Sequence, residues 1–226
     1  MKETWRAEMK YTIPAAESRM LSARLSVFMD RDANGGENGY AVRSLYFDNF
    51  YNKVLREKLD GIGIRDKYRI RCYDNDFSFL RLEKKSKKYD RGHKTQCVVT
   101  KEEVLRILDG DIDWMSQDER PLVRELFLRM RLEFFRPQNV VEYDREAFTY
   151  GPGNVRITFD RNIRGCGNPR QFFQKDLPSV PALNYGLTVM EVKYDEYLPD
   201  VVNRTVLTVR KKEQAFSKYA ACRLAE

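Results

Sequence analysis

The chain has 226 residues, 42% of them hydrophobic, and its 41 lysines and arginines exceed its 34 acidic residues to give a net charge of +7. A chain of this size buries a sufficient core without disulfides or a structural metal, and its four scattered cysteines form no CxxC pair, which argues against a zinc site. No stretch approaches the roughly 20 apolar residues of a bilayer span, and the N-terminus lacks a secretory h-region. We therefore expect a cytoplasmic protein forming a single domain over residues 1–226, with a basic balance that suits an anionic partner.

Short strands and helices are expected to follow one another along the whole chain. In chain order, the predicted strands lie at 6–11, 42–48, 67–72, 80–85, 94–99, 140–148, 155–160 and 187–194. The predicted helices begin after Pro14, near 49–58, after Thr100, at 118–130 and at 199–209. Thr100 and Glu103 have the spacing of a capping box. These elements predict an antiparallel α+β fold.

The segment from Lys67 to Lys85 predicts a β-hairpin with one charged face. Side chains alternate with the period of a strand on both sides of Asp74-Asn75-Asp76, which favours a turn. The apolar face holds Tyr, Ile, Cys and Leu side chains. The charged face carries five cations and one carboxylate: Lys67, Arg69, Arg71, Arg81, Lys85 and Glu83. One such hairpin would ordinarily turn its charged face to water.

The same charged alternation recurs in other predicted strands, as in Glu8/Lys10, Arg156/Asp160 and Glu191/Lys193, with Arg43 and Arg145 as single cations. A wet outer face usually carries Ser, Thr, Asn and Gln as well, whereas Arg and Lys dominate here. If the sheet closes, its charged faces line a polar lumen and its apolar faces pack against helices. The occupant that best matches such a lumen is a polyanion, because arginine forks fit phosphate oxygens.

Carboxylates among so many cations have two explanations. Glu191 and Glu83 either form ion pairs or bind a hard divalent ion, which prefers oxygen ligands and takes one or two carboxylates together with phosphate oxygens. Other chemistries find little support: His93 stands in a polar stretch typical of a solvated side chain, and P-loop, GxGxxG and GxSxG motifs are absent. Phosphoryl transfer needs no dedicated protein nucleophile, which agrees with the absence of these motifs.

Eight ordered motifs give the chain a family resemblance. They are EMKY (8–11), VRSLYFD (42–48), KYRIRCY (67–73), LEKKSKK (82–88), YDREAF (143–148), VRITFD (155–160), MEVKYDEYLP (190–199) and SKY (217–219). In this order they resemble VTC-type polyphosphate polymerase domains of the triphosphate tunnel metalloenzyme superfamily, which are related to CYTH-type triphosphatases. The resemblance implies a closed eight-stranded antiparallel β-barrel, or tunnel, with surrounding helices. It also implies that ATP and polyphosphate bind with Mn²⁺ or Mg²⁺, and that the ATP γ-phosphate is transferred to a polyphosphate chain.

The resemblance also implies roles for particular residues. The phosphate-gripping catalytic cations would be Lys10, Arg69, Arg71, Lys85 and Arg145, together with Lys218, which would close over the terminal phosphate. Further substrate-binding positions would be Arg43, Lys67, Lys94, Arg156, Lys193 and Ser217. The metal-binding carboxylate would be Glu191, with Glu83 as a second candidate.

One departure from the superfamily concerns its ExExK opening, which is Arg6-Ala-Glu8-Met-Lys10 here, so the first acidic position is basic. The smaller number of carboxylates favours one metal ion over two. Two alternatives stay open, a tunnel triphosphatase and a non-catalytic polyphosphate-binding module. An RNA-binding barrel is disfavoured because the aromatic residues fall mostly on the apolar faces, so no nucleic-acid partner is expected. The chain carries neither the phosphate-sensing nor the membrane-spanning domain of eukaryotic VTC proteins. We therefore expect no translocation by this chain alone, with membrane-associated partner proteins left open.

Overall fold

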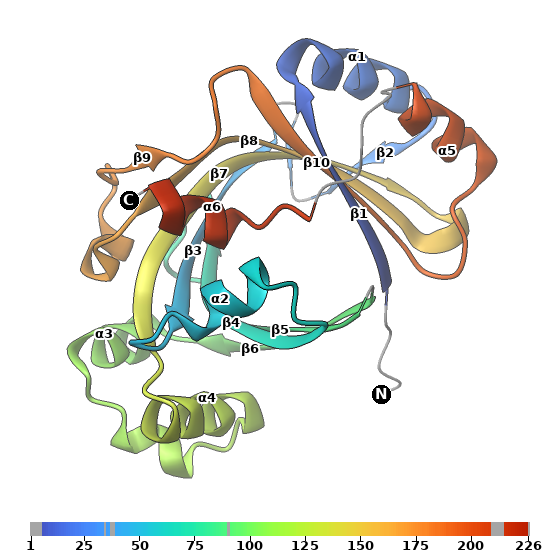
Figure 1. Cartoon of the computed structure of the whole chain (residues 1–226). Helices are drawn as coiled ribbons and strands as arrows, with labels where there is room; N and C mark the ends of the chain where they lie inside the picture. Colours follow the sequence, from blue (N-terminus) through green and yellow to red (C-terminus); the bar gives the residue numbers. More distant parts are fainter. Residues whose placement is uncertain (1–5, 34, 37–38, 90, 209–214, 226) are drawn as a thin grey trace.

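The computed structural model describes residues 6–33, 35–36, 39–89, 91–208 and 215–225, and its architecture is mixed α+β (Figure 1). The strands are β1 (Arg6–Pro14), β2 (Asp30–Arg31), β3 (Tyr40–Asp48), β4 (Ile64–Tyr73), β5 (Leu80–Lys88), β6 (Arg91–Val99), β7 (Arg136–Tyr150), β8 (Val155–Cys166), β9 (Val180–Pro181) and β10 (Leu187–Tyr194). The α-helices are α1 (Ala15–Leu25), α2 (Lys53–Leu59), α3 (Lys101–Asp109), α4 (Pro121–Leu132), α5 (Asp200–Leu207) and α6 (Lys218–Ala225). Short 3₁₀ turns lie at Asp113–Gln117, Pro152–Asn154 and Pro169–Phe173.

Local sequence signals explain several element boundaries. The Thr100 hydroxyl accepts from the Glu103 amide, and the Glu103 carboxylate accepts from the Thr100 amide, so the predicted capping box at α3 is confirmed. Asp74 and Asn75 have positive φ, as a tight turn between β4 and β5 requires. Helix α2 begins later than predicted because the Asn49 side chain accepts from two backbone amides and holds the preceding residues in a turn.

The antiparallel sheet has the order β2-β7-β3-β4-β5-β6-β1-β10-β8-β9, and β7 also pairs with β8. Each of the eight long strands therefore hydrogen-bonds to a long strand on both sides. The pairing between β1 and β6 is the shortest of these, with only Arg6 opposite Gly92 and Ala7 opposite Arg91. By contrast, β1 and β10 pair over eight positions from Ala7 to Pro14.

The register places the charged residues of neighbouring strands on one face of the sheet. Lys10 pairs with Glu191, which pairs with Thr158, and Arg69 pairs with both Tyr46 and Glu83. Because directly opposed residues point to the same side of a sheet, the charged alternation continues from strand to strand. We call this surface the charged face.

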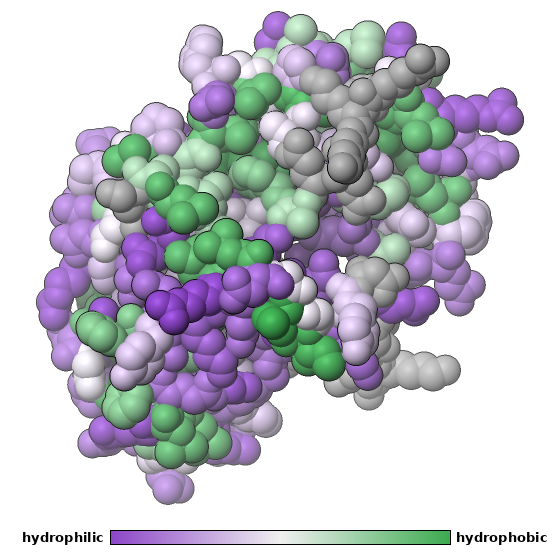
Figure 2. Space-filling model, viewed as in Figure 1, coloured by the Kyte–Doolittle hydropathy of each residue, from purple (hydrophilic) through white to green (hydrophobic). Residues whose placement is uncertain are grey.

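The opposite face of the sheet is apolar and packs against helices. One core cluster includes Tyr68, Ile70 and Leu82 from the sheet with Val104 of α3 and Leu126 of α4. A second cluster joins strands β1, β8 and β10 to helices α1 and α5, which lie together in Figure 1. Figure 2 shows hydrophilic residues over much of the molecule in this view, with apolar residues in smaller groups. Within the described ranges, no helix has both the length and the apolar character needed to cross a membrane.

Candidate functional site

Lys218, the first residue of α6, lies among the acidic residues of the charged face. Its Nζ is 2.5 Å from Asp160 Oδ2 and 2.8 Å from Glu191 Oε1, and it lies 4.9 Å from the centre of the Tyr143 ring. The next residue, Tyr219, fixes α6 to the sheet by donating a 2.6 Å hydrogen bond from its hydroxyl to Asp48. The C-terminal helix therefore carries a buried ammonium group across to carboxylates on β8 and β10.

Glu191 is surrounded by cations from four elements. Besides Lys218, its carboxylate oxygens lie 3.1 Å from Lys193, 3.6 Å from Lys10 and 4.0 Å from Arg145. Burial by itself would raise the pKa of Glu191, but Lys218, Lys193 and Lys10 hold this pKa well below its usual value. Glu191 is therefore an ionised, buried oxygen donor.

Arg145 and Asp160 form a two-pronged ion pair across the β7–β8 pairing. Arg145 Nε and Nη2 donate to the two oxygens of Asp160 at 2.6 and 2.8 Å. Asp160 is fully buried, and Arg145 and Lys218 lower its pKa against the effect of burial. This fork fixes the orientation of the Arg145 guanidinium, whose Cζ lies 5.2 Å from the Tyr143 ring.

A second acidic centre lies on β1. Glu8 is 2.8 Å from Lys10, 2.7 Å from Lys85 and 3.9 Å from Lys193. Burial lowers the pKa of Lys85 from 10.5 to about 7, even though the neighbouring Glu8 acts in the opposite direction. Lys85 thus exchanges a proton near neutral pH.

Glu83 forms an ion-pair centre on β5. Its Oε2 accepts from Arg69 at 2.6 and 2.7 Å and lies 3.9 Å from Arg71, while its Oε1 is 3.2 Å from Lys94. The side chain is completely buried, and these cations lower its pKa despite burial. Both Glu83 oxygens are thus engaged by cations.

Arg71 and Lys67 complete the charged face of β4. Arg71 donates to Ser44 Oγ and to the Tyr143 hydroxyl, both at 3.1 Å. Lys67 Nζ is 3.1 Å from Ser217 Oγ and 5.7 Å from the centre of the Tyr219 ring. Two predicted site residues, Lys67 and Ser217, therefore meet although 150 positions separate them in the chain.

Two predicted substrate-binding arginines have other partners. Arg156 is on the charged face opposite Lys193, and its guanidinium contacts Asp32 and donates to the Tyr40 hydroxyl at 2.9 Å. Arg43 requires a correction, because it pairs with Cys72 and Glu142 and therefore points to the opposite face of the sheet. There it is 1% exposed, bonds Glu142 at 2.6 Å and donates to the Phe172 carbonyl at 3.0 Å. Arg43 does not join the other site residues.

A divalent ion would find oxygen donors beside Lys218. The described residues contain no group of three or more His, Cys, Asp or Glu side chains that could hold a metal ion by themselves. Mg²⁺, however, commonly binds through one or two carboxylates and completes its shell with phosphate oxygens and water. Glu191, with Asp160 bridged to it by Lys218, fits that pattern.

Sequence reasoning gave no site role to Glu8, Asp160 or Tyr143, although the structure puts them beside the predicted cations. The alternation of Glu8 with Lys10, and of Asp160 with Arg156, was the available signal for the two carboxylates. No spacing signal pointed to Tyr143. Its hydroxyl accepts from Arg71, and its ring faces Arg145 and Lys218.

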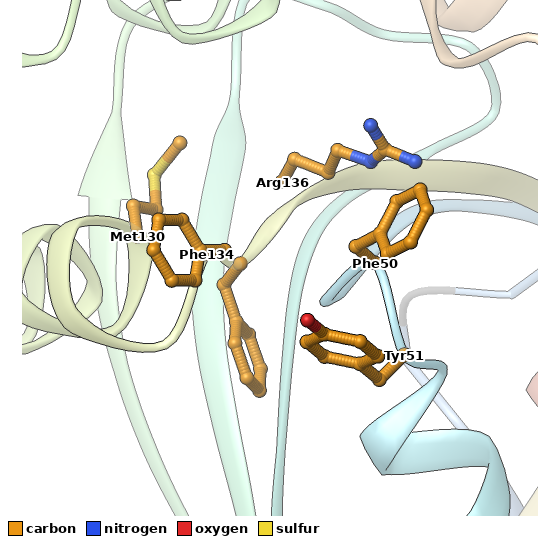
Figure 3. Close-up of a pocket in the computed structure, with 6 residues that line it drawn as sticks. Phe50, Tyr51, Met130, Phe134 and Arg136 are labelled. Carbon is orange, nitrogen blue, oxygen red and sulfur yellow. The ribbon is translucent and has the colours of Figure 1, made fainter.

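A separate hollow of about 500 Å³ lies away from these residues and is drawn in Figure 3. Its lining is mainly aromatic and contains none of the predicted site residues: Phe50, Tyr51, Met130, Phe134, Phe135 and Arg136. The charged face, and not this hollow, gathers the ionisable groups.

Several solved structures share the fold at low sequence identity. A Hippeastrum protein provisionally described as an adenylyl cyclase, with a dominant triphosphatase activity, has a TM-score of 0.59 at 14% identity, covering 98% of this chain and 95% of its own. A Bacillus halodurans protein provisionally described as an adenylate cyclase has a TM-score of 0.54 at 13% identity, covering 92% and 90%. The Pyrococcus horikoshii protein PH1819 has a TM-score of 0.50 at 10% identity, covering 96% and 95%.

Sequence comparison is more specific than these likenesses of fold. No curated protein matches the chain. The family model described as the VTC domain matches residues 5–225, which is nearly the whole chain and includes every residue of the charged face discussed above. The chain therefore belongs to the VTC domain family.

Proposed function

We propose that the chain is a metal-dependent polyphosphate polymerase that transfers the γ-phosphate of ATP to a polyphosphate chain inside a closed, eight-stranded tunnel. The observation that carries this proposal is the continuous charged face around Lys218, Glu191 and Arg145, combined with membership of the VTC domain family. The match over residues 5–225 supports a single domain.

The strand pairings support the tunnel. Eight long strands each have a long neighbour on both sides, and the β7–β8 pairing joins the two ends of the run. A sheet closed in this way has an interior face and an exterior face. The exterior is the apolar face that packs against α1, α3, α4 and α5, which leaves the charged face for the interior.

The charged residues suit phosphoryl transfer because its catalysis consists mainly of positioning and charge neutralisation. Arg69, Arg71 and Arg145 are held by ion pairs or hydrogen bonds that fix their guanidinium forks. Preorganised donors of this kind stabilise charge that develops on the transferred group. Lys10 and Lys218 would add point charges next to Glu191.

A bound Mn²⁺ or Mg²⁺ would supply Lewis-acid stabilisation of the phosphate oxygens. Glu191 would hold it, and Asp160 is the neighbouring carboxylate, paired with the same Lys218 ammonium group. Position 6 holds an arginine, which adds no carboxylate to the charged face and pairs with Asp195 at 2.8 Å. The smaller number of carboxylates supports one metal ion over two.

Incubation of the purified protein with ATP and Mn²⁺ tests the proposal. We expect ADP and long polyphosphate, resolved on a polyacrylamide gel. Lys218→Met should lower this activity by about 10²–10³-fold, whereas Arg170→Met should keep it, since Arg170 forms an exposed pair with Asp109 on the outer surface. Tight polyphosphate binding without ATP consumption in any divalent ion would identify a binding module instead and refute the polymerase proposal.

A tunnel triphosphatase is the second candidate. It is favoured by the fold shared with the Hippeastrum protein, for which a dominant triphosphatase activity is described. The same incubation separates the two reactions, because a triphosphatase releases orthophosphate from ATP or tripolyphosphate and forms no polymer.

A further inference from the structure

The Ser217 hydroxyl and the Lys67 amine meet on the charged face. Ser217 Oγ and Lys67 Nζ are 3.1 Å apart, within direct hydrogen-bond reach. Ser217 precedes α6 and its Oγ also accepts from the Ala220 amide at 3.4 Å. Lys67 Nζ is the donor of the 3.1 Å bond, so both contacts use lone pairs of the serine oxygen, and the hydroxyl proton passes to Lys67 only when Lys67 is the neutral amine.

The surroundings of Lys67 disfavour its charged form, so the neutral amine that can accept a proton is easier to reach than for an exposed lysine. Among the described residues, no carboxylate pairs with Lys67, in contrast to Lys10, Lys85 and Lys94. Burial lowers the pKa of Lys67 well below 10.5, and Lys10 is the largest of the cationic neighbours that lower it further. The Tyr219 ring at 5.7 Å acts in the other direction, by a weak cation–π contact.

Ser217 lies between two residues that contact the proposed catalytic machinery. The carbonyl of the preceding Phe216 accepts from Lys10 Nζ at 3.2 Å. The following residue, Lys218, reaches Glu191 and Asp160. A terminal phosphate bound by Lys10 and Lys218 would therefore lie beside the Ser217 hydroxyl, a step that rests on the proposed function.

We propose that Ser217 is a self-phosphorylation site, at which a nucleoside triphosphate bound on the charged face donates its terminal phosphoryl group to the serine. Ser217 Oγ forms a bond to the γ-phosphorus, and the bond from that phosphorus to the β–γ bridging oxygen breaks. The nucleoside diphosphate leaves with the electron pair of the broken bond. The hydroxyl proton passes to Lys67 Nζ, which becomes an ammonium group.

A phosphoserine at position 217 would have favourable electrostatic surroundings. A phosphoserine carries roughly −1.5 to −2 charges and three acceptor oxygens. At position 217 it would stand at the N-terminus of α6, where a negative charge is favourable. It would also lie next to the newly protonated Lys67 and near Lys10.

The test is peptide mapping by mass spectrometry after incubation of the full chain with Mg²⁺ and either ATP or its γ-thio analogue, whose thiophosphoryl product resists hydrolysis. We expect one transferred group per chain on the peptide that contains Ser217. Ser217→Asn should abolish labelling while keeping the helix cap, because Asn is a good N-cap residue without a hydroxyl. Ser217→Thr should restore labelling as phosphothreonine.

One variant tests the role of Lys67, and two further variants serve as matched controls. Lys67→Met should slow labelling about 100-fold, the typical contribution of a general base. Lys88→Met, on the exposed end of the neighbouring strand, should label at the normal rate. Ser86→Ala removes a hydroxyl that donates to Asp66 and should also leave labelling unchanged.

ADP is measured in parallel so that the proposed polymerase and the proposed self-phosphorylation can be refuted independently. ADP formation without a label at Ser217 from either nucleotide overturns the self-phosphorylation and leaves the proposed polymerase standing. Labelling of Ser217 without polyphosphate supports the modification and refutes the polymerase. Normal labelling of the Lys67→Met variant overturns the proton transfer and with it this inference.

Discussion

Replacement of Glu83 by Gln isolates the charge of a completely buried carboxylate on the charged face. Gln keeps the size of the side chain and one carbonyl oxygen, so the change removes charge and little packing. Three cations depend on this carboxylate: Arg69 at 2.6 Å, Lys94 at 3.2 Å and Arg71 at 3.9 Å. Removal of one partner from a buried ion pair costs about 3–5 kcal/mol because the other charge is left uncompensated.

The lower end of that range applies here. Glu83 is completely buried and Arg69 largely so, but Lys94 is 44% exposed and water can solvate it once its partner is lost. We therefore expect Glu83→Gln to lower the free energy of unfolding by about 3 kcal/mol at pH 7. This corresponds to a roughly 140-fold larger unfolding constant, since 1.4 kcal/mol is a factor of ten.

The pH dependence has a definite sign. In the folded protein Arg69, Arg71 and Lys94 lower the pKa of Glu83 below its usual 4.5. The stability that this carboxylate contributes is therefore present above about pH 4.5 and is lost as the pH falls through the lower folded value. The variant lacks this contribution at every pH, so the difference between the two proteins should narrow in acid.

Urea unfolding followed by circular dichroism measures both effects. The control is Glu119→Gln, an exposed residue outside the charged face, which should change the free energy of unfolding by no more than about 0.5 kcal/mol. A loss below about 1 kcal/mol for Glu83→Gln with an unchanged urea dependence, or a difference that grows in acid, would refute the ion-pair assignment.

Three further outcomes are expected. Lys218→Met should lower the rate of ATP consumption by 10²–10³-fold, the typical effect of losing one preorganised charge-stabilising donor, and an unchanged rate would exclude Lys218 from the site. Because the pKa of Lys85 is lowered from 10.5 to about 7, tripolyphosphate affinity measured by calorimetry should fall as the pH rises through 7. Lys85→Arg should flatten this pH dependence. An equally steep fall of affinity in that variant would contradict the assignment of the titration to Lys85. Thr100→Ala removes a capping-box hydroxyl and should cost about 1 kcal/mol in urea unfolding, whereas a neutral effect would show that the cap does not stabilise α3.

The hairpin shows how far local pattern carries. Alternation on either side of Asp74-Asn75-Asp76 predicted β4 and β5, and the structure extends both strands by a few residues. The capping box at Thr100 was equally visible, because its two hydrogen bonds join residues three positions apart. The short strands β2 and β9 were missed because two residues show no periodicity.

Arg43 shows where local pattern stops. Its strand is rich in β-formers on both sides, so alternation does not reveal which face Arg43 takes. The register decides it: Ser44 pairs with Arg71, which turns Arg43 to the other face, opposite Glu142. A shift of one residue would have exchanged the two faces.

The sequence by itself determined the strand periodicity, the excess of arginine and lysine on one side of those strands, and the ordered motifs of the VTC domain, because each is written within a few consecutive residues. Only the tertiary structure decided which carboxylate meets which cation. Lys218 reaches Asp160 and Glu191, and Ser217 reaches Lys67, across long stretches of chain. Such contacts are fixed by strand register and by the docking of α6, and no spacing along the chain encodes either.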